Sequence, residues 1–159
     1  MGVRYPSWLS LLKYLVHLIC HCSSSSTLTT SFAPVSKLKS LRISLMEGND
    51  GLLLQTIKHL TALEELVLFN YNGDGMELEW QCLRKLQNLK LYDHPKLAFL
   101  PLGLQQATSL QNLKISNCLS LKTLPKWICN IISLQSLEIW DCPNLTSLLG
   151  VTYLKILTI

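Results

Sequence analysis

The segment LQNLKISNCLSL, at residues 110–121, is followed by LQSLEIWDCPNL at residues 134–145. Five apolar residues of the first segment recur in the second, always 24 residues later: Leu110, Leu113, Ile115, Cys118 and Leu121. Self-similarity at a period of about 20 to 29 residues, with the spacing L-x-x-L-x-L, indicates a stack of units that each contain one short strand and a returning segment. The chain is therefore expected to be organised as repeats.

Alternation along a strand explains this spacing. Leu113 and Ile115 would point into a core, whereas Lys114 and Ser116 would point outward. One strand cannot bury such a row alone, but parallel strands about 4.8 Å apart cover one another's rows. The pattern predicts an α/β fold, a right-handed leucine-rich repeat solenoid with a parallel sheet on its concave face and short helical or irregular segments on its convex face.

The same template fits the chain seven times. The expected strands start at Leu15, Leu38, Leu63, Leu86, Leu110, Leu134 and Leu154. The residues six and three places before each start are all apolar: Leu9 and Leu12, Phe32 and Val35, Ile57 and Leu60, Trp80 and Leu83, Leu104 and Ala107, Ile128 and Ile131, Leu148 and Val151. Apolar residues at this spacing fit a helical or 3₁₀ turn that returns the chain to the next strand. We expect about seven repeats forming one domain over residues 1–159.

Neither end of the sequence reads as a polar cap. Trp8 and Leu9 start within a returning segment, and Ile159 falls on a core position of a strand. Solenoids need capping repeats to shield their terminal apolar rows. The sequence is therefore expected to be a fragment of a longer protein, lacking terminal caps.

The composition argues against several classes of partner. The 14 basic and 10 acidic residues give a net charge of only +4, without an arginine-rich run, so nucleic acid is not expected. The apolar run over residues 8–20 is interrupted by polar residues and is too short for a membrane span, which needs about 20 apolar residues. Six cysteines are too few for a disulfide scaffold, and Cys118 and Cys142 share one repeat position. Reduced thiols and a cytoplasmic location are the preferred interpretation.

No motif in the sequence indicates catalysis. A nucleophile, a base and an orienting group cannot be assembled, so an enzyme is not expected, and no catalytic residue, cofactor or small-molecule substrate is assigned. His17, Cys20 and His21 have the chemistry of metal ligands, but the two histidines would face the concave side and Cys20 the core, so no metal site is predicted. His94 is expected to be a surface or turn residue.

The outward residues of the strands are the best candidates for function. The predicted partner-binding residues on the concave face are Arg42, Phe69, Lys90, Tyr92, Lys114 and Trp140. Aromatic side chains flanked by Arg and Lys are typical of binding hot spots. Lys90 and Lys114 would add positive charge that favours an acidic protein partner. The alternative is that these aromatic residues are exposed without consequence.

Three features resemble the leucine-rich repeats of plant intracellular nucleotide-binding disease-resistance proteins. The unit L-x-x-L-x-I-x-x-C-x-x-L-x-x-L-P occurs at residues 110–125 and, with His94 in place of Cys, at residues 86–101. The phrase LQSLEIWDCPNLTSL at residues 134–148 is similar to family wording, although Leu149 stands where the family usually has Pro. YPSWL at residues 5–9 resembles the segment that often opens this repeat block. The resemblance covers essentially the whole chain.

This resemblance implies a protein-recognition module of an immune receptor, which binds pathogen effectors, host proteins or other domains of its parent receptor. The resemblance does not extend to the nucleotide-binding module, because no G-x-x-x-x-G-K-[ST] loop occurs in this sequence. An extracellular receptor repeat domain is an alternative, but it would normally show Asn at the Cys118 position and a Gly-x-Ile-Pro phrase. A substrate adaptor of a ubiquitin ligase and an inactive truncated product are two others. The sequence upstream of Met1 would distinguish these alternatives.

Overall fold

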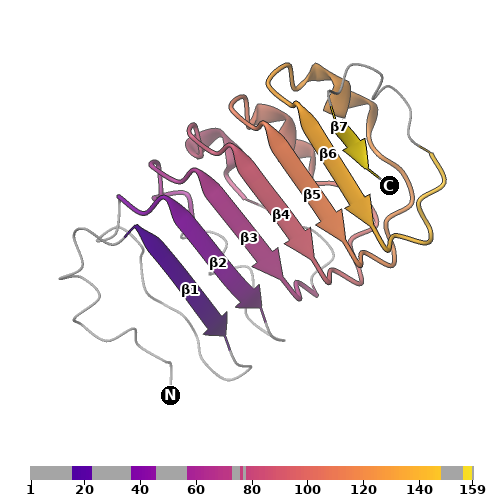
Figure 1. The fold of residues 1–159 in the computed structure, drawn as a ribbon, viewed down its shortest axis with the longest axis horizontal. Coiled ribbons are helices and arrows are strands. Elements are labelled where there is room, and N and C mark those ends of the chain that lie inside the picture. The colour runs from indigo at the N-terminus through magenta and orange to yellow at the C-terminus, as the bar shows by residue number, and fades with distance from the viewer. Residues whose placement is uncertain are drawn as a thin grey trace.

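The computed structural model describes residues 16–22, 37–45, 57–72, 76, 78–147 and 156–158. These contain the strands β1 (His17–Cys22), β2 (Ser40–Leu45), β3 (Glu65–Phe69), β4 (Asn88–Tyr92), β5 (Asn112–Ser116), β6 (Ser136–Trp140) and β7 (Ile156–Thr158). They form one parallel sheet in the order β1 to β7, so that each strand lies beside its neighbour in sequence (Figure 1). The sheet therefore has the architecture of stacked repeats.

The register of the sheet follows the leucine template. One row of paired residues runs through Leu41, Leu66, Leu89, Leu113 and Leu137, and the next through Ile43, Leu68, Leu91, Ile115 and Ile139. All ten side chains are at most 2% exposed. Leu157 continues the first row on β7 but is 42% exposed, because no described strand follows it. The predicted core rows are confirmed, and a slip of one residue would turn them toward solvent.

Short 3₁₀ helices close the core on the side opposite the sheet. They are η3 (Trp80–Cys82), η4 (Leu102–Gln106) and η5 (Lys126–Asn130). Eight of the fourteen predicted apolar positions lie in the described residues, and all are buried: Ile57, Leu60, Trp80, Leu83, Leu104, Ala107, Ile128 and Ile131. The other six, Leu9, Leu12, Phe32, Val35, Leu148 and Val151, lie outside the described residues. The prediction of 3₁₀ returning segments is confirmed at η3, η4 and η5.

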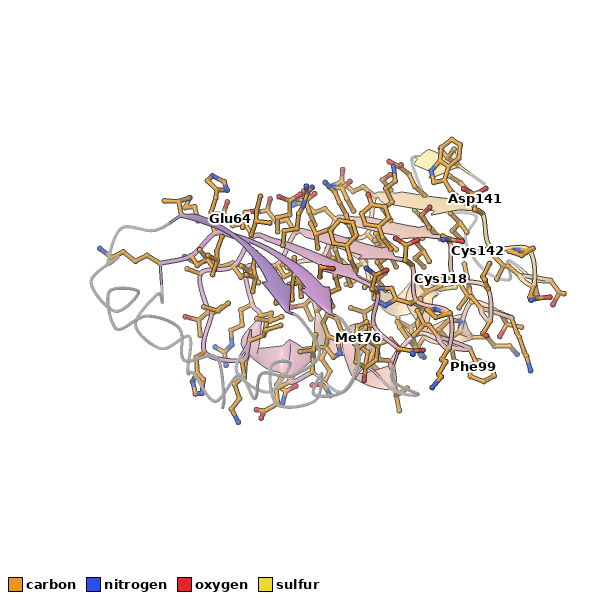
Figure 2. All side chains as sticks on the ribbon, turned by 90° about the horizontal axis from the view of Figure 1, so that it is seen from below. Glu64, Met76, Phe99, Cys118, Asp141 and Cys142 are labelled. Atoms are coloured by element: carbon orange, nitrogen blue, oxygen red, sulfur yellow. The ribbon has the colours of Figure 1, made fainter. Side chains whose placement is uncertain are left out.

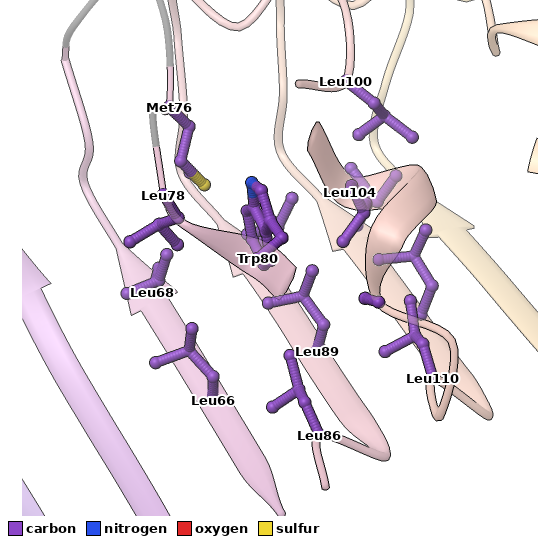
Figure 3. Close-up of a cluster of buried hydrophobic side chains, with 14 of the residues drawn as sticks. Leu66, Leu68, Met76, Leu78, Trp80, Leu86, Leu89, Leu100, Leu104 and Leu110 are labelled. Atoms are coloured by element: carbon purple, nitrogen blue, oxygen red, sulfur yellow. The ribbon is translucent and has the colours of Figure 1, made fainter. Parts of the chain in front are cut away.

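Trp80 is the largest side chain of the core. It fills the space between Leu89 and Leu104, below Met76 (Figure 3), and it is 1% exposed. A Cβ atom at Gly103 would lie 2.8 Å from Cδ1 of Trp80, which is too close for ordinary packing. The bulk of the indole in η3 therefore requires a residue without a side chain in η4.

Each of four strands is followed directly by a residue in the left-handed backbone region. These residues are Asn70, Asp93, Asn117 and Asp141, with φ of 57°, 60°, 55° and 52°. Asn and Asp tolerate this conformation better than other residues with a side chain. The amide of each of the first three donates a 3.0 Å hydrogen bond to the backbone carbonyl that ends the next strand. These left-handed residues were not predicted from the sequence, although Asn or Asp recurs there at offsets of 23, 24 and 24 residues.

The next position in each repeat forms a second ladder, through Tyr71, His94, Cys118 and Cys142. The amide of Tyr71 donates to Nδ1 of His94 at 3.1 Å, and Nε2 of His94 lies 3.1 Å from the carbonyl oxygen of Leu68. The backbone of His94 likewise forms a hydrogen bond with the Cys118 thiol. The backbone of Cys118 forms the same hydrogen bond with the Cys142 thiol. Imidazole and thiol are interchangeable here because both accept a hydrogen bond from the preceding repeat.

The exposure of His94 differs from the prediction. It is a turn residue, as proposed, but it is 0% exposed and not on the surface. A neutral ring with its proton on Nε2 satisfies both of its short contacts. Burial is the main cause that lowers its pKa below 6.5. Burial also raises the pKa of the Cys118 thiol to about 12, and Cys82, Cys118 and Cys142 are thiols that form no disulfide.

Candidate recognition surface on the concave sheet face

The outward residues of β2 to β6 form three rows across the sheet, and all six predicted partner-binding residues belong to two of them. One row runs through Arg42, Val67, Lys90, Lys114 and Glu138, and the other through Ser44, Phe69, Tyr92, Ser116 and Trp140. In Figure 2 side chains rise from the upper side of the sheet, while Met76 and Phe99 lie below it. The structure thus brings the predicted residues together on one face.

Phe69 and Tyr92 form one packed unit. Their rings are stacked with centroids 5.1 Å apart and an interplanar angle of 19°. The guanidinium carbon of Arg42 lies 5.6 Å from the centroid of Phe69, within the range of a cation–π contact. In this half of the face, the side chains of Arg42, Phe69 and Tyr92 are therefore held in place by contacts with one another.

Trp140 lies two strands beyond Tyr92 and is 43% exposed. The ammonium of Lys114 is 5.8 Å from the centroid of its ring and 2.9 Å from a carboxylate oxygen of Glu138. The hydrogen bond to Glu138 raises the pKa of Lys114, and the same bond lowers the pKa of Glu138. A side-chain hydrogen bond from Trp140 lowers the pKa of Glu138 further, so that one carboxylate orients both neighbours.

The charges on this face are nearly balanced, which amends the expectation of a positive surface. Lys90 donates to Glu65 at 2.7 Å, and Ser40 donates to the other carboxylate oxygen of Glu65 at 2.9 Å. The Lys90 hydrogen bond is the main cause that lowers the pKa of Glu65. Lys114 is paired with Glu138. Neither lysine therefore offers an uncompensated charge to a partner.

Two positions in the rows that contain the predicted residues are buried, although the strand pattern placed them on an exposed face. Val67 is 1% exposed, because it lies in register between Arg42 and Lys90, whose long side chains flank it on both sides. Ser44 is 7% exposed, and its hydroxyl accepts a hydrogen bond from the side-chain Nδ2 of Asn70 at 3.3 Å. These two positions contribute to stability and are not available to a partner.

Ser116 is a functional candidate outside the six predicted partner-binding residues. It sits in the aromatic row between Tyr92 and Trp140 and is half-buried, so the space above it is reached by solvent. The signal was present in the sequence as a small residue in a row that reads Phe69, Tyr92, Ser116, Trp140. This signal can be interpreted only once the sheet is known, because the stacking of the strands makes these residues neighbours.

Among the described residues, no group of three or more His, Cys, Asp or Glu side chains is placed to hold a metal ion. The same part of the chain contains no helix long and apolar enough to cross a membrane. The side chains of Cys20 and His21 lie outside the described set, although the backbone register places His17 and His21 in the outward rows and Cys20 in a core row.

Comparison with known proteins establishes the fold. The leucine-rich repeat domain of the type III effector XCV3220 (XopL) is similar to this chain, with a TM-score of 0.54 and 21% sequence identity. The match covers 86% of this chain and 55% of that structure, so the chain spans about half of its length. No protein-family model and no curated protein matches the chain. The chain has the leucine-rich repeat fold, which generally serves as a non-catalytic scaffold for protein binding.

Proposed function

We propose that this chain is the protein-recognition module of a plant intracellular immune receptor of the nucleotide-binding leucine-rich repeat class. The observation that carries the proposal is the concave face, where Phe69, Tyr92 and Trp140 lie in one row beside Arg42 and Lys114. Aromatic and Arg side chains concentrate binding energy at protein interfaces. The repeat wording at residues 110–125 and 134–148 supports the particular receptor class.

The proposed partners are pathogen effectors, host proteins or other domains of the parent receptor, and the proposed location is the cytoplasm. A balanced face of alternating ion pairs and aromatic rings favours a protein surface as partner, because such a surface offers complementary apolar and polar groups. The proposed role is recognition, so the chain needs no catalytic residue or cofactor of its own.

The test compares proteins captured from plant leaf cells by three forms of the tagged chain. Tyr92→Ala combined with Trp140→Ala removes two rings of the concave face. Ile132→Ala is the matched control, because Ile132 is 98% exposed in the loop that follows η5 and is not part of the sheet. We expect partners to bind the unmodified chain and the control at least tenfold more than the double variant. Partners that bind all three forms equally would exclude the concave face as the recognition surface.

The receptor role is tested separately with a partner that passes this comparison. When expressed in leaf cells together with the chain joined to the nucleotide-binding portion of its parent receptor, the partner should change the defence response. The double variant should abolish that change while accumulating to the same level. A partner that binds but never alters the response would leave protein recognition in place and reject the immune role.

A further inference from the structure

The aromatic row of the concave face has one missing member. Phe69 and Tyr92 lie on neighbouring strands and stack with a centroid distance of 5.1 Å. Tyr92 and Trp140 are separated by an additional strand, and the residue between them is Ser116. At about 4.8 Å per strand the two aromatic residues are anchored about 9.6 Å apart.

We propose that the space above Ser116 is a slot for one aromatic side chain of an extended peptide segment, and that the same segment carries an acidic residue that pairs with Arg42. This inference rests on the proposed function and names the chemistry of the partner. The slot consists of Tyr92 and Trp140 as walls and Ser116 as the floor, with the Lys114 ammonium over the Trp140 ring.

The width of the slot matches one ring. Stacked aromatic rings in proteins have centroids about 4.5 to 7 Å apart, so an inserted ring needs roughly this distance on each side. Two stacking distances like that between Phe69 and Tyr92 add up to about the 9.6 Å between the strands that carry the two walls. A Ser side chain is too short to fill this height, and its half-buried state leaves the floor accessible.

The groups around the slot favour an aromatic guest over an aliphatic one. Lys114 lies next to Ser116 but on the neighbouring outward row, and its ammonium is 5.8 Å from the ring of Trp140. A ring inserted beside Trp140 would meet the same cation, which attracts the electron-rich face of an aromatic group. An aliphatic side chain would gain contact area but no such electrostatic attraction.

The charges on the concave face indicate why the partner segment should also carry an acidic residue. The outward rows of β2 to β6 contain the cations Arg42, Lys90 and Lys114 and the carboxylates Glu65 and Glu138. The carboxylates pair with the two lysines, and among the described residues Arg42 has no carboxylate within ion-pair distance. Asp93 and Asp141 lie just beyond the strand ends at the slot. An acidic group of the partner is therefore attracted toward Arg42 and repelled from the slot end.

The spacing between the two elements follows from the sheet. Arg42 on β2 and Ser116 on β5 are three strands apart, which corresponds to about 14 Å. An extended peptide covers about 3.3 Å per residue, so a segment that crosses the strands would place its acidic residue about four positions from its aromatic residue. A partner of this kind combines one buried ring with one charge pair.

The experiment selects peptides from a display library of random twelve-residue sequences on the unmodified chain, with removal of those that also bind Ser116→Phe. The Phe side chain at position 116 would occupy the slot from within the chain. Ser116→Ala is the matched control, because it leaves the slot open. Thermal unfolding of both variants verifies that they fold.

We expect the selected peptides to share one Phe, Tyr or Trp, with Asp or Glu about four positions away. Binding should weaken at least tenfold in Ser116→Phe, change less than twofold in Ser116→Ala, and weaken severalfold in Arg42→Gln. Replacing the shared aromatic residue of the peptide with Leu should weaken binding at least tenfold.

Three results would overturn the slot. Failure to recover any peptide that distinguishes the unmodified chain from Ser116→Phe is one, and selected peptides without a shared aromatic residue are another. The third is equal binding of the aromatic and Leu peptides. The proposed recognition role would survive these results if a protein partner still depended on Tyr92 and Trp140, so the two failures are distinguishable.

Discussion

The two faces of the same strands differ in what they demand from the sequence. On β5, Leu113 and Ile115 are at most 1% exposed and belong to unbroken aliphatic rows, whereas Lys114 and Ser116 lie outward and vary from repeat to repeat. On β6, Ile139 is 2% exposed and its neighbour Trp140 is 43% exposed. Residues adjacent in sequence thus carry separate tasks, with stability on one face and the proposed recognition on the other. Substitutions can test how complete this separation is.

The largest effect is expected from Leu113→Ala. The side chain is 1% exposed and packs between Leu89 and Leu137 of the neighbouring strands, so its truncation leaves a cavity. The free energy of unfolding should fall by about 2 to 5 kcal/mol, measured by urea denaturation. Lys114→Ala on the same strand is the control and should change it by no more than about 1 kcal/mol. Similar losses in both variants would show that the two faces are not separate.

Gly103→Ala should have the next largest effect. The added methyl group would lie 2.8 Å from Cδ1 of Trp80, and overpacking of this kind costs about 1 to 3 kcal/mol. The same change in a Trp80→Leu background should cost much less, because the smaller side chain leaves room in the core. Urea denaturation of the two single variants and the double variant gives the coupling energy. Additive effects would show that the Trp80 contact does not explain the glycine.

His94 should make the core side sensitive to acid. Burial lowers its pKa below 6.5, so the unfolded chain takes up a proton at a higher pH than the folded chain does. The stability that comes from burying a neutral His94 ring is fully present above pH 6.5, and the free energy of unfolding should fall as the pH drops below that value. The nearby carboxylate of Asp93 opposes the shift without reversing it.

The control for this effect is His94→Cys, which introduces the residue that two other repeats have at this position. Its thiol stays protonated across this range and can still accept the Tyr71 amide hydrogen bond. Melting temperatures measured between pH 7 and pH 5 should fall less steeply for the variant than for the unmodified chain. Equal slopes would assign the acid sensitivity to other groups.

The smallest effect on stability is expected from Trp140→Ala. The indole is 43% exposed, so the free energy of unfolding should change by only about 0.5 kcal/mol. Binding to a partner found through the concave face should nevertheless weaken by about 2 kcal/mol or more, measured by calorimetry. A variant that unfolds would place Trp140 in the core network, whereas a variant with normal binding would remove it from the recognition surface.

The sequence by itself determined the repeats, the strand register and the division between core and outward residues. This was possible because the alternation along a strand is local and the period of about 24 residues repeats it, so that Leu113 and Leu137 must be neighbours once the units stack. The six partner-binding candidates could be placed on one face for the same reason. Recurrent Asn and Asp after the strands could also have been recognised from the sequence.

Only the tertiary structure decided how side chains from different repeats share the available space. The ion pair of Lys90 with Glu65, the stack of Phe69 on Tyr92 and the burial of Val67 depend on side-chain conformations across neighbouring strands. Likewise, the buried ring of His94 is satisfied by a hydrogen bond from the backbone of Tyr71, 23 residues earlier. A linear pattern specifies which residues become neighbours, but their charges and shapes then compete for contacts in three dimensions.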